Sequence, residues 1–131
     1  MATIEDAIFS RASGFAGLVA LVADRVYPRR LPSGVTLPAV TYGLIDDVEP
    51  QAMGGGAGVT TARFQFTAWA ETFGSARDVG VQLRAAFGRW RGTVAAIEVQ
   101  DSLPAGRAED NDPAAGLFWR HQDYLISYVE A

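Results

Sequence analysis

The chain contains no cysteine and no lysine, and it has a single histidine, His121. Without cysteine it forms neither disulfides nor thiolate metal sites, so its stability has to come from packing. One histidine rules out sites that need a pair of histidines, and it makes any hydrolase-like triad depend on His121 alone. All eleven cationic side chains are therefore arginines. The planar arginine fork suits subunit interfaces, and a GC-rich genome is the alternative explanation of this bias.

Positive charge is also scarce, because fifteen acidic side chains against eleven arginines give a net charge of −4. Affinity for nucleic acid needs clustered cations, and the tight clusters are limited to Arg29 with Arg30 and Arg89 with Arg91. The longest apolar stretch, residues 15–23, is far too short to cross a bilayer, and the N-terminal residues carry no basic leader region. We therefore expect a soluble, untargeted protein with no membrane contact.

The composition that is present is that of a folded domain. The 131 residues are 49% apolar and 20% charged, which is ordinary for a globular protein. A chain of this length buries roughly two-thirds of the surface that it exposes when unfolded. No internal repeat or linker interrupts it, so we expect one domain spanning residues 1–131.

The most informative local pattern is rich in proline: VYPRRLP at residues 26–32 and LPAVTY at residues 37–42. Proline fixes φ at about −65° and pushes the residue before it toward extended conformations. We therefore expect a stiff, non-helical connector that leads into a strand at residues 39–45, where Val, Thr and Tyr alternate with other residues. The acidic residues 46–50 should end that strand.

Periodicity predicts helices in two regions. Residues 3–13 have a capping-box-like start, with Thr3 followed by Asp6, and residues 18–22 can form a short second segment. Thr72 should cap a long helix that Gly92 ends. The glycine at position 80 falls on the inward stripe of that helix, so we expect the helix to approach the sheet closely there.

Three further strands are expected, at residues 59–70, 93–101 and 117–129. The first alternates most clearly, and a glycine-rich loop at 51–58 precedes it. A second acidic loop at residues 109–113 should separate the last two strands. The side chains assigned to the core are aromatic and fall on inward positions: Phe64, Phe66, Phe73, Phe87 and Trp90.

The element order predicts an α+β fold: an antiparallel sheet of four to five strands, with an N-terminal helix and a long central helix packed on one face. Its motifs resemble those of the phage tail-completion, or tail-terminator, family. The matching residues are Arg25 to Pro28, Leu31-Pro32, Leu37 to Tyr42, the strand end Phe66 to Ala70, and the helix Ala76 to Phe87 followed by Trp90 to Thr93. The likeness covers nearly the whole chain and involves packing residues, not reactive ones.

The resemblance implies a structural virion protein, a hexameric ring subunit that caps the tail tube and joins it to the head connector. Phage-derived particles such as gene transfer agents would use the same part. The implied partners are other copies of the chain, the tail tube protein and a head-proximal connector or stopper protein, while DNA passes through the lumen without specific binding. The implied location is the virion tail at its junction with the head, after assembly in the bacterial cytoplasm.

Two sets of residues are candidates for this role, and neither is catalytic. The first set is expected at partner interfaces: Arg29, Arg30, Met53, Gly54, Gly55 and Gly56. The second set is acidic and is expected to face the DNA channel, because a positive lumen would bind phosphates and stall transit: Asp46, Asp47, Glu49, Glu109, Asp110 and Asp112. Plain solvated loops and a flexible hairpin tip are the alternative interpretations of both sets.

We predict no catalytic, cofactor-binding or metal-binding residues. The acidic sets lack the spacing of a calcium loop, and the glycine run lacks the Lys-Ser/Thr of a phosphate loop. Two alternative functions stay open. One is a small α+β binding module, and the other is a hydrolase-like enzyme in which His121 acts as a base served by Asp123 or a distant serine.

Overall fold

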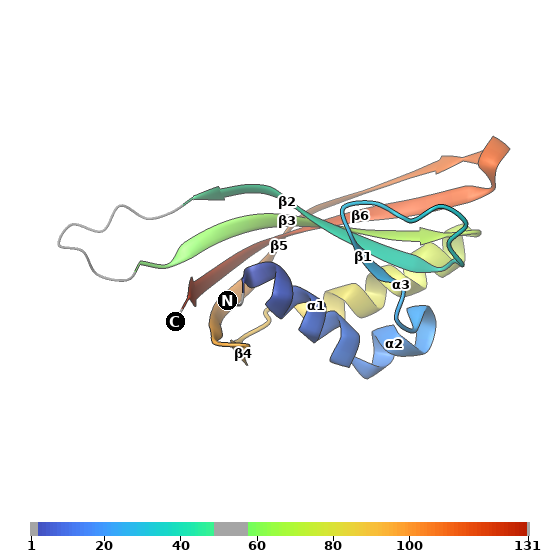
Figure 1. Ribbon diagram of the computed structural model, residues 1–131. Helices are drawn as coiled ribbons and strands as arrows, with labels where there is room; N and C mark the ends of the chain where they lie inside the picture. The colour runs from blue at the N-terminus through green and yellow to red at the C-terminus, as the bar shows by residue number, and fades with distance from the viewer. Residues whose placement is uncertain (1–2, 49–57, 131) are drawn as a thin grey trace.

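The computed structural model describes residues 3–48 and 58–130. The helices are α1 (Ile4–Gly14), α2 (Ala16–Val22), α3 (Phe73–Phe87) and the short 3-10 helix η1 (Pro113–Ala115). The strands are β1 (Val26–Pro28), β2 (Ala39–Val48), β3 (Thr60–Ala70), β4 (Gly92–Val94), β5 (Ile97–Asp112) and β6 (Leu117–Glu130). Figure 1 shows the three α-helices grouped under one face of a long, twisted sheet. None of the described helices combines the length and the apolar character that a bilayer span requires.

The sheet has six strands in the order β1-β2-β3-β6-β5-β4. The α+β class is therefore confirmed, but the expected number of four to five strands is wrong, and the sheet is not antiparallel throughout. The pairing of β1 with β2 is parallel, and the other pairings are antiparallel. The additional parallel strand comes from the start of the proline-rich connector, because Val26 pairs with Val40 and Pro28 closes a short edge strand, where a missing N–H is tolerated.

The region predicted as one strand at 93–101 is instead a hairpin of β4 and the start of β5. Ala95 and Ala96 turn the chain with φ of 51° and 69°. Two consecutive residues with positive φ form a tight turn whose twist matches that of the flanking strands. Asn or Gly at these positions usually signals such a turn in a sequence. Alanine at both positions hides that signal in the sequence.

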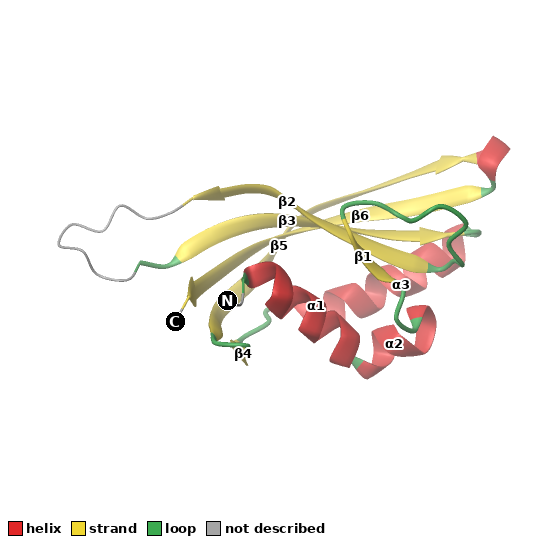
Figure 2. Cartoon of the chain, in the orientation of Figure 1, coloured by secondary structure: helices red, strands yellow, loops and turns green. Residues whose placement is uncertain are grey.

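The acidic segments are strand, not loop, wherever the structure describes them. β2 runs on through Asp46 and Asp47, and β5 runs on to Asp112, paired with Leu117 of β6. Only η1 separates β5 from β6, so the loop predicted at residues 109–113 is wrong. Both segments are the outer strands of the sheet at these points (Figure 2), and their charged side chains are exposed.

The core lies between the helices and the sheet, around a group of aromatic rings. Phe66 stacks on Phe87 with ring centroids 4.4 Å apart, and Tyr124 and Trp90 meet this pair edge-on at 5.6 and 5.5 Å. Of the five predicted core aromatics, Phe73 is wrong, because it lies in the first turn of α3 and is 51% exposed. Helix α3 also ends at Phe87 and not near position 92, and Trp90 is buried from the segment that follows.

Local signals at the helix starts are confirmed. The Thr3 N–H donates to Asp6 Oδ2 at 2.9 Å and the Asp6 N–H donates to Thr3 Oγ1 at 3.4 Å, which completes a capping box. The Thr72 hydroxyl accepts from the Ser75 N–H at 3.1 Å at the start of α3. These bonds fix where both helices begin.

Candidate interaction surfaces

The sheet presents a stretch of open edge on each side. On one side β1 pairs with β2 only from Val40 to Tyr42, and on the other β4 pairs with β5 only from Ile97 to Val99. In the described part of the chain, residues 43–48 and 103–112 have no further strand beside them, whereas the Ser102 carbonyl already accepts from the Arg89 N–H at 2.6 Å. Such edges expose unpaired backbone N–H and C=O groups, which are templates for pairing with another chain.

Both open edges carry features that restrict which strand can pair with them. β2 has a bulge between Leu44 and Asp46, which leaves Ile45 55% exposed. β5 has register shifts after Val99 and after Pro104. Bulges, proline and charged side chains are typical defences against indiscriminate edge pairing. These edges are therefore suited to a partner of matching shape and charge.

The face of the sheet that the helices leave open is covered by polar cross-strand pairs between β3 and β6. Thr61 bonds Ser127 at 3.0 Å, and Thr67 bonds His121 Nδ1 at 2.9 Å. Cross-strand pairs of this kind contribute roughly 0.2–1 kcal/mol each. The open face is thus ordered and mostly polar, and it also carries the ring pair of Trp69 and Trp119, whose centroids lie 5.2 Å apart.

Asp123 lies on this open face, and its carboxylate binds residues other than His121. The Arg63 guanidinium forms an ion pair with Asp123 at 2.8 Å, and Gln65 Nε2 donates to the other carboxylate oxygen at 3.2 Å. His121 bonds Thr67. The pair expected for a hydrolase-like site, His121 served by Asp123, is therefore not assembled by these bonds.

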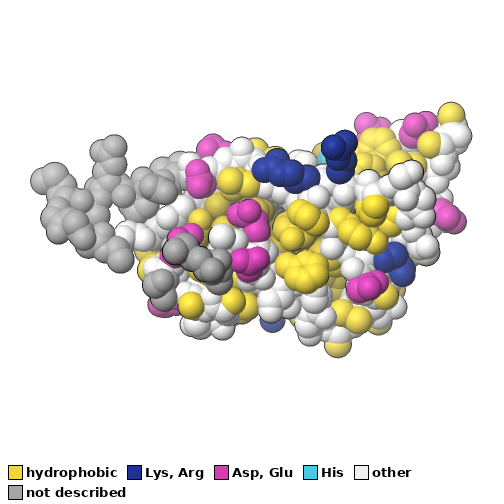
Figure 3. Space-filling model, viewed as in Figure 1, with side chains coloured by type: hydrophobic (Ala, Val, Ile, Leu, Met, Phe, Trp, Pro, Cys, Tyr) yellow, Lys and Arg dark blue, Asp and Glu magenta, His cyan; other side chains and the backbone are white. Residues whose placement is uncertain are grey.

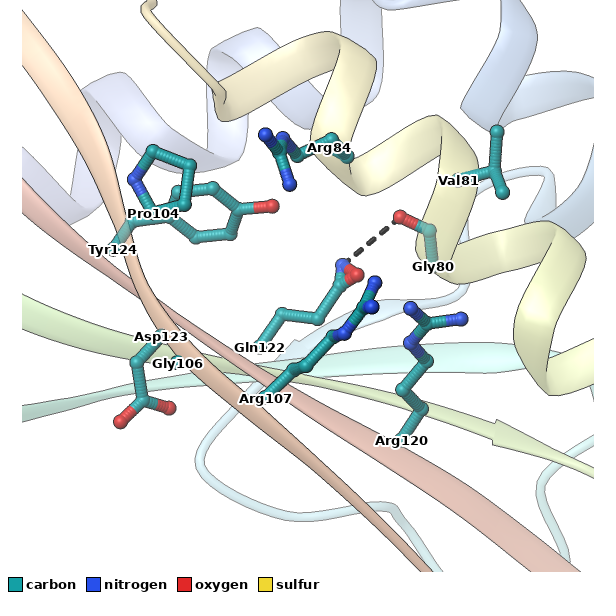
Figure 4. Close-up of a pocket in the computed structure, with 10 residues that line it drawn as sticks. All are labelled: Gly80, Val81, Arg84, Pro104, Gly106, Arg107, Arg120, Gln122, Asp123 and Tyr124. Atoms are coloured by element: carbon teal, nitrogen blue, oxygen red, sulfur yellow. Dashed lines mark hydrogen bonds between the residues drawn. The ribbon is translucent and has the colours of Figure 1, made fainter.

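A cavity of about 290 Å³ lies between α3 and strands β5 and β6 (Figure 4). Arg84 from α3, Arg107 from β5 and Arg120 from β6 line it. Figure 4 shows Arg107 and Arg120 reaching from the sheet toward the helix, whereas the Asp123 carboxylate points to the other side. The cavity therefore gathers guanidinium groups from three elements that are distant in the sequence.

Close approach of α3 to β6 forms the back of this cavity. Gln122 Nε2 donates to the Gly80 carbonyl at 2.9 Å. A Cβ on Gly80 would lie 2.9 Å from Arg120 Cδ and 3.1 Å from Gln122 Oε1. The prediction that glycine at position 80 lets helix and sheet approach closely is therefore confirmed.

Burial and charge act together on the cavity side chains. Arg120 is only 9% exposed, and its Nε has no hydrogen-bond partner. Burial raises the pKa of Tyr124, and the nearby positive charges of Arg84 and Arg120 oppose that rise. Sequence reasoning missed this site, although an arginine on the inward face of a strand, in line with Gln122 and Tyr124, was a signal.

The residues predicted at partner interfaces are placed only in part. Arg29 and Arg30 are exposed just after β1, where Arg29 has φ of 70° and its N–H donates to the Tyr42 carbonyl at 2.8 Å. Met53 and the glycines at positions 54–56 lie outside the described residues. The two arginines therefore stand on a fixed turn beside β2.

The described acidic residues predicted for a channel do not share one face. Residues directly opposite in an antiparallel pair point to the same side. Asp46 is opposite Arg63 and Asp110 is opposite Trp119, on the open face, whereas Asp47 is opposite buried Ala62 on the helix side. Figure 3 accordingly shows acidic side chains at separate places, not in one patch.

The last three acidic candidates are placed as follows. Glu109 lies opposite Arg120, on the helix side, and Asp112 Oδ1 accepts from the Ala115 N–H at 3.4 Å at the start of η1. Glu49 lies outside the described residues. In the described part of the chain, no group of three or more His, Cys, Asp and Glu side chains is arranged to hold a metal ion.

The fold and these surfaces define a class of protein, an α+β unit with open sheet edges and polar faces suited to contacts with other chains. The sequence model of the family described as "Tail completion protein gp17" matches residues 6–128, so the chain belongs to that family. It is accordingly a structural virion protein of the phage tail-completion type.

Solved structures and curated proteins add two findings. A chain in the structure titled "Virion of native gene transfer agent (GTA) particle" has a similar fold, with a TM-score of 0.73 and 14% sequence identity. The similarity covers 95% of this chain and 92% of that chain. No curated protein matches the sequence.

Proposed function

We propose that the protein is a tail-terminator ring subunit. Six copies close a ring that caps the tail tube on one side and meets a head-proximal connector or stopper protein on the other. Membership of the tail-completion family supports this role. The observation that carries it is the pair of open sheet edges, because a ring needs two different surfaces on each subunit that fit each other.

The register of the sheet supports a head-to-tail contact between the two edges. Gly43 of β2 pairs with Gln65, Gln65 with Asp123, and Asp123 with Gly106 of β5. The open stretches of β2 and β5 therefore lie at the same height along the strands, on opposite sides of the sheet. Three antiparallel pairings separate β2 from β5, so these strands run in opposite directions. Side-by-side copies would therefore bring the two open edges together as an antiparallel pair.

The open polar face gives the ring a surface for its channel. Asp46 and Asp110 lie on that face, and Asp123 is neutralised there by Arg63. A channel without free clustered cations lets DNA slide, since phosphate contacts would hold it. We assign the channel role to the acidic residues of the open face and leave the helix-side residues Asp47 and Glu109 out of it.

The remaining expectations belong to the same proposal. Arg29, Arg30 and residues 53–56 would contact the tail tube or the connector, and the protein would act without catalysis in a virion or phage-like particle assembled in the bacterial cytoplasm. The engagement of Asp123 by Arg63 and Gln65 supports a structural role over a His121-centred hydrolase.

The mass of the native protein, alone and bound to purified tail tubes, tests this function. We expect a sixfold mass in one or both conditions, and we expect particles lacking the gene to have tails of abnormal length that do not attach to capsids. Normal tails and normal capsid attachment in electron micrographs of the deletion particles would refute the proposal.

A further inference from the structure

The arginine cavity, lined by Arg84, Arg107 and Arg120, is built for an anion. The ion pairs between described residues involve Arg63, Arg77, Arg89 and Arg91, and none involves a cavity arginine. Arg120 is nine-tenths buried and its Nε is unpartnered. A desolvated charge is costly unless it is paired and hydrogen-bonded, so this arrangement is complete only with a negative group in the cavity.

The acidic groups around the cavity do not supply that charge. Asp123 lines the cavity wall, but its carboxylate is held on the opposite face of the sheet by Arg63 and Gln65. Glu109 lies opposite Arg120 in the strand pairing, and in the part of the chain that the structure describes it forms no ion pair. The anion must therefore come from outside this fold or from a rearranged Glu109, which the experiment below separates.

The size and position of the cavity favour a protein carboxylate over nucleic acid. A recess of about 290 Å³ has room for a carboxylate side chain, and the guanidinium fork binds a carboxylate through two parallel hydrogen bonds. The DNA backbone is read by exposed, clustered cations, whereas Arg120 is 9% exposed. Arg107 stands on β5, so the cavity opens beside the unpaired edge of that strand.

The edge of β2 on a second copy carries the matching charge. Asp46 and Asp47 are both exposed there, and Asp47 shares the helix-side face on which the cavity lies. Resting on the ring arrangement proposed above, we propose that Asp47 of one copy enters the arginine cavity of the next and pairs with Arg107 and Arg120. A positive recess on one edge and a carboxylate on the other make the contact self-complementary and directional.

The strand register sets the offset that this contact needs. Within one copy, the pairings of Asp47 with Ala62, Ala62 with Ile126 and Ile126 with Ser102 place Asp47 at the height of Ser102. Arg107 lies five residues further along β5. A stagger of a few residues, on the order of 10–17 Å, would bring Asp47 to the cavity. Strands that close into a ring are staggered in this way, so the offset is compatible with closure.

Exchanging the two charges tests the contact. Arg107→Glu and Asp47→Arg, each alone, should raise the concentration needed for ring formation by at least about tenfold, and the double variant should bring it back to within a few-fold of the wild type. Native mass spectrometry measures ring formation, and the thermal midpoint of the dissociated protein checks that each variant folds. Both side chains are exposed, so folding should be retained.

Matched variants identify the source of the anion. Arg77→Glu reverses an exposed arginine of α3 outside the cavity lining, and Glu109→Gln removes the carboxylate opposite Arg120. Both should assemble like the wild type. If Glu109→Gln blocks assembly while Asp47→Arg does not, the anion belongs to the same chain and the inference is overturned.

The outcomes also separate this inference from the ring itself. If Arg107→Glu forms rings at the same concentration as the wild type, the Asp47 contact is overturned and the ring proposal stands. The same holds if the double variant does not regain ring formation. A wild-type protein that shows no sixfold mass, alone or on tail tubes, overturns both. The absence of cysteine allows a further check, because cysteines introduced at 47 and 107 together should give a covalent ladder with a short bis-maleimide, and either cysteine alone should not.

Discussion

Single side chains of the core explain why the helices stay on the sheet. Trp90 meets Phe87 edge-on at 5.5 Å and is 4% exposed, although it lies beyond the end of α3. The Arg11 guanidinium lies 6.0 Å from the Trp90 ring, and Arg11 Nε donates to the Ala86 carbonyl at 3.0 Å. Trp90 therefore helps to join α1, α3 and the chain that follows α3.

Trp90→Ala should lower the free energy of unfolding by about 3–5 kcal/mol, because it removes a large buried side chain and leaves a cavity. Phe73→Ala is the matched control, and since Phe73 is 51% exposed it should cost less than about 1 kcal/mol. Urea unfolding measures both values. Equal losses in the two variants would contradict the placement of these rings.

A second residue, Asp101, controls the segment between α3 and β5. Partial desolvation acts to raise its pKa, but the hydrogen bond from the Ser102 N–H and the charges of Arg89 and Arg91 outweigh this and hold the pKa of Asp101 below its usual value. Its Oδ2 lies 3.0 Å from Arg89 and 3.6 Å from Arg91. One carboxylate thus ties both arginines to the start of β5.

The lowered pKa of Asp101 predicts a dependence of stability on acidity. The stability due to this group is present above the pKa of the unfolded chain and is lost as pH falls through the folded value. Asp101→Asn should therefore lower the thermal midpoint at neutral pH, and the difference from wild type should shrink as the pH falls below the ordinary range of aspartate pKa values. Asp24→Asn, at an exposed position, controls for the loss of a carboxylate. A difference that persists unchanged at low pH would refute this role.

At the scale of elements, the two short edge strands decide where the sheet is open. β1 and β4 each have three residues, and each covers only part of the longer strand beside it. Long uncovered edges are avoided in proteins that act alone, and here both carry bulges. The edges are thus partly protected surfaces available to a defined partner.

Hydrogen exchange should detect the use of these edges. Amides in residues 43–48 and 103–112 that point outward should exchange more slowly after ring assembly, because they gain partners on a neighbouring copy. Amides of β3, which has a strand on both sides, should be protected before and after and serve as the internal control. Rings whose edge amides exchange as fast as in the dissociated protein would show that the copies meet elsewhere.

At the scale of the whole molecule, the sign of charge on the open face decides how DNA is treated. Asp110→Arg places a cation on that face, whereas Asp78→Arg makes the same change on the exposed side of α3. If the open face lines the channel, the first variant should bind duplex DNA several-fold more tightly at low salt and the second should not. Fluorescence anisotropy of assembled rings measures this. Equal affinities for DNA would place the open face outside the channel.

The sequence by itself determined the features that depend on neighbours along the chain. The capping box at Thr3, the cap at Thr72 and the alternation of residues 60–70 each involve residues a few positions apart. The α+β class and the resemblance to the tail-completion family follow from such local patterns. The close approach of α3 to the sheet at Gly80 was likewise predictable, because a glycine on the inward stripe of a helix indicates close packing.

Only the tertiary structure decided the features that require distant partners. Residues 109–112 are strand because β6 pairs with them, and β1 exists because β2 lies beside it. The cavity joins Arg84, Arg107 and Arg120, which the sheet register and the packing of α3 bring together. Backbone pairing and charge burial depend on three-dimensional neighbours, so sequence spacing shows neither which edges stay open nor which arginines meet in the cavity, although Arg120 on an inward strand position was one signal.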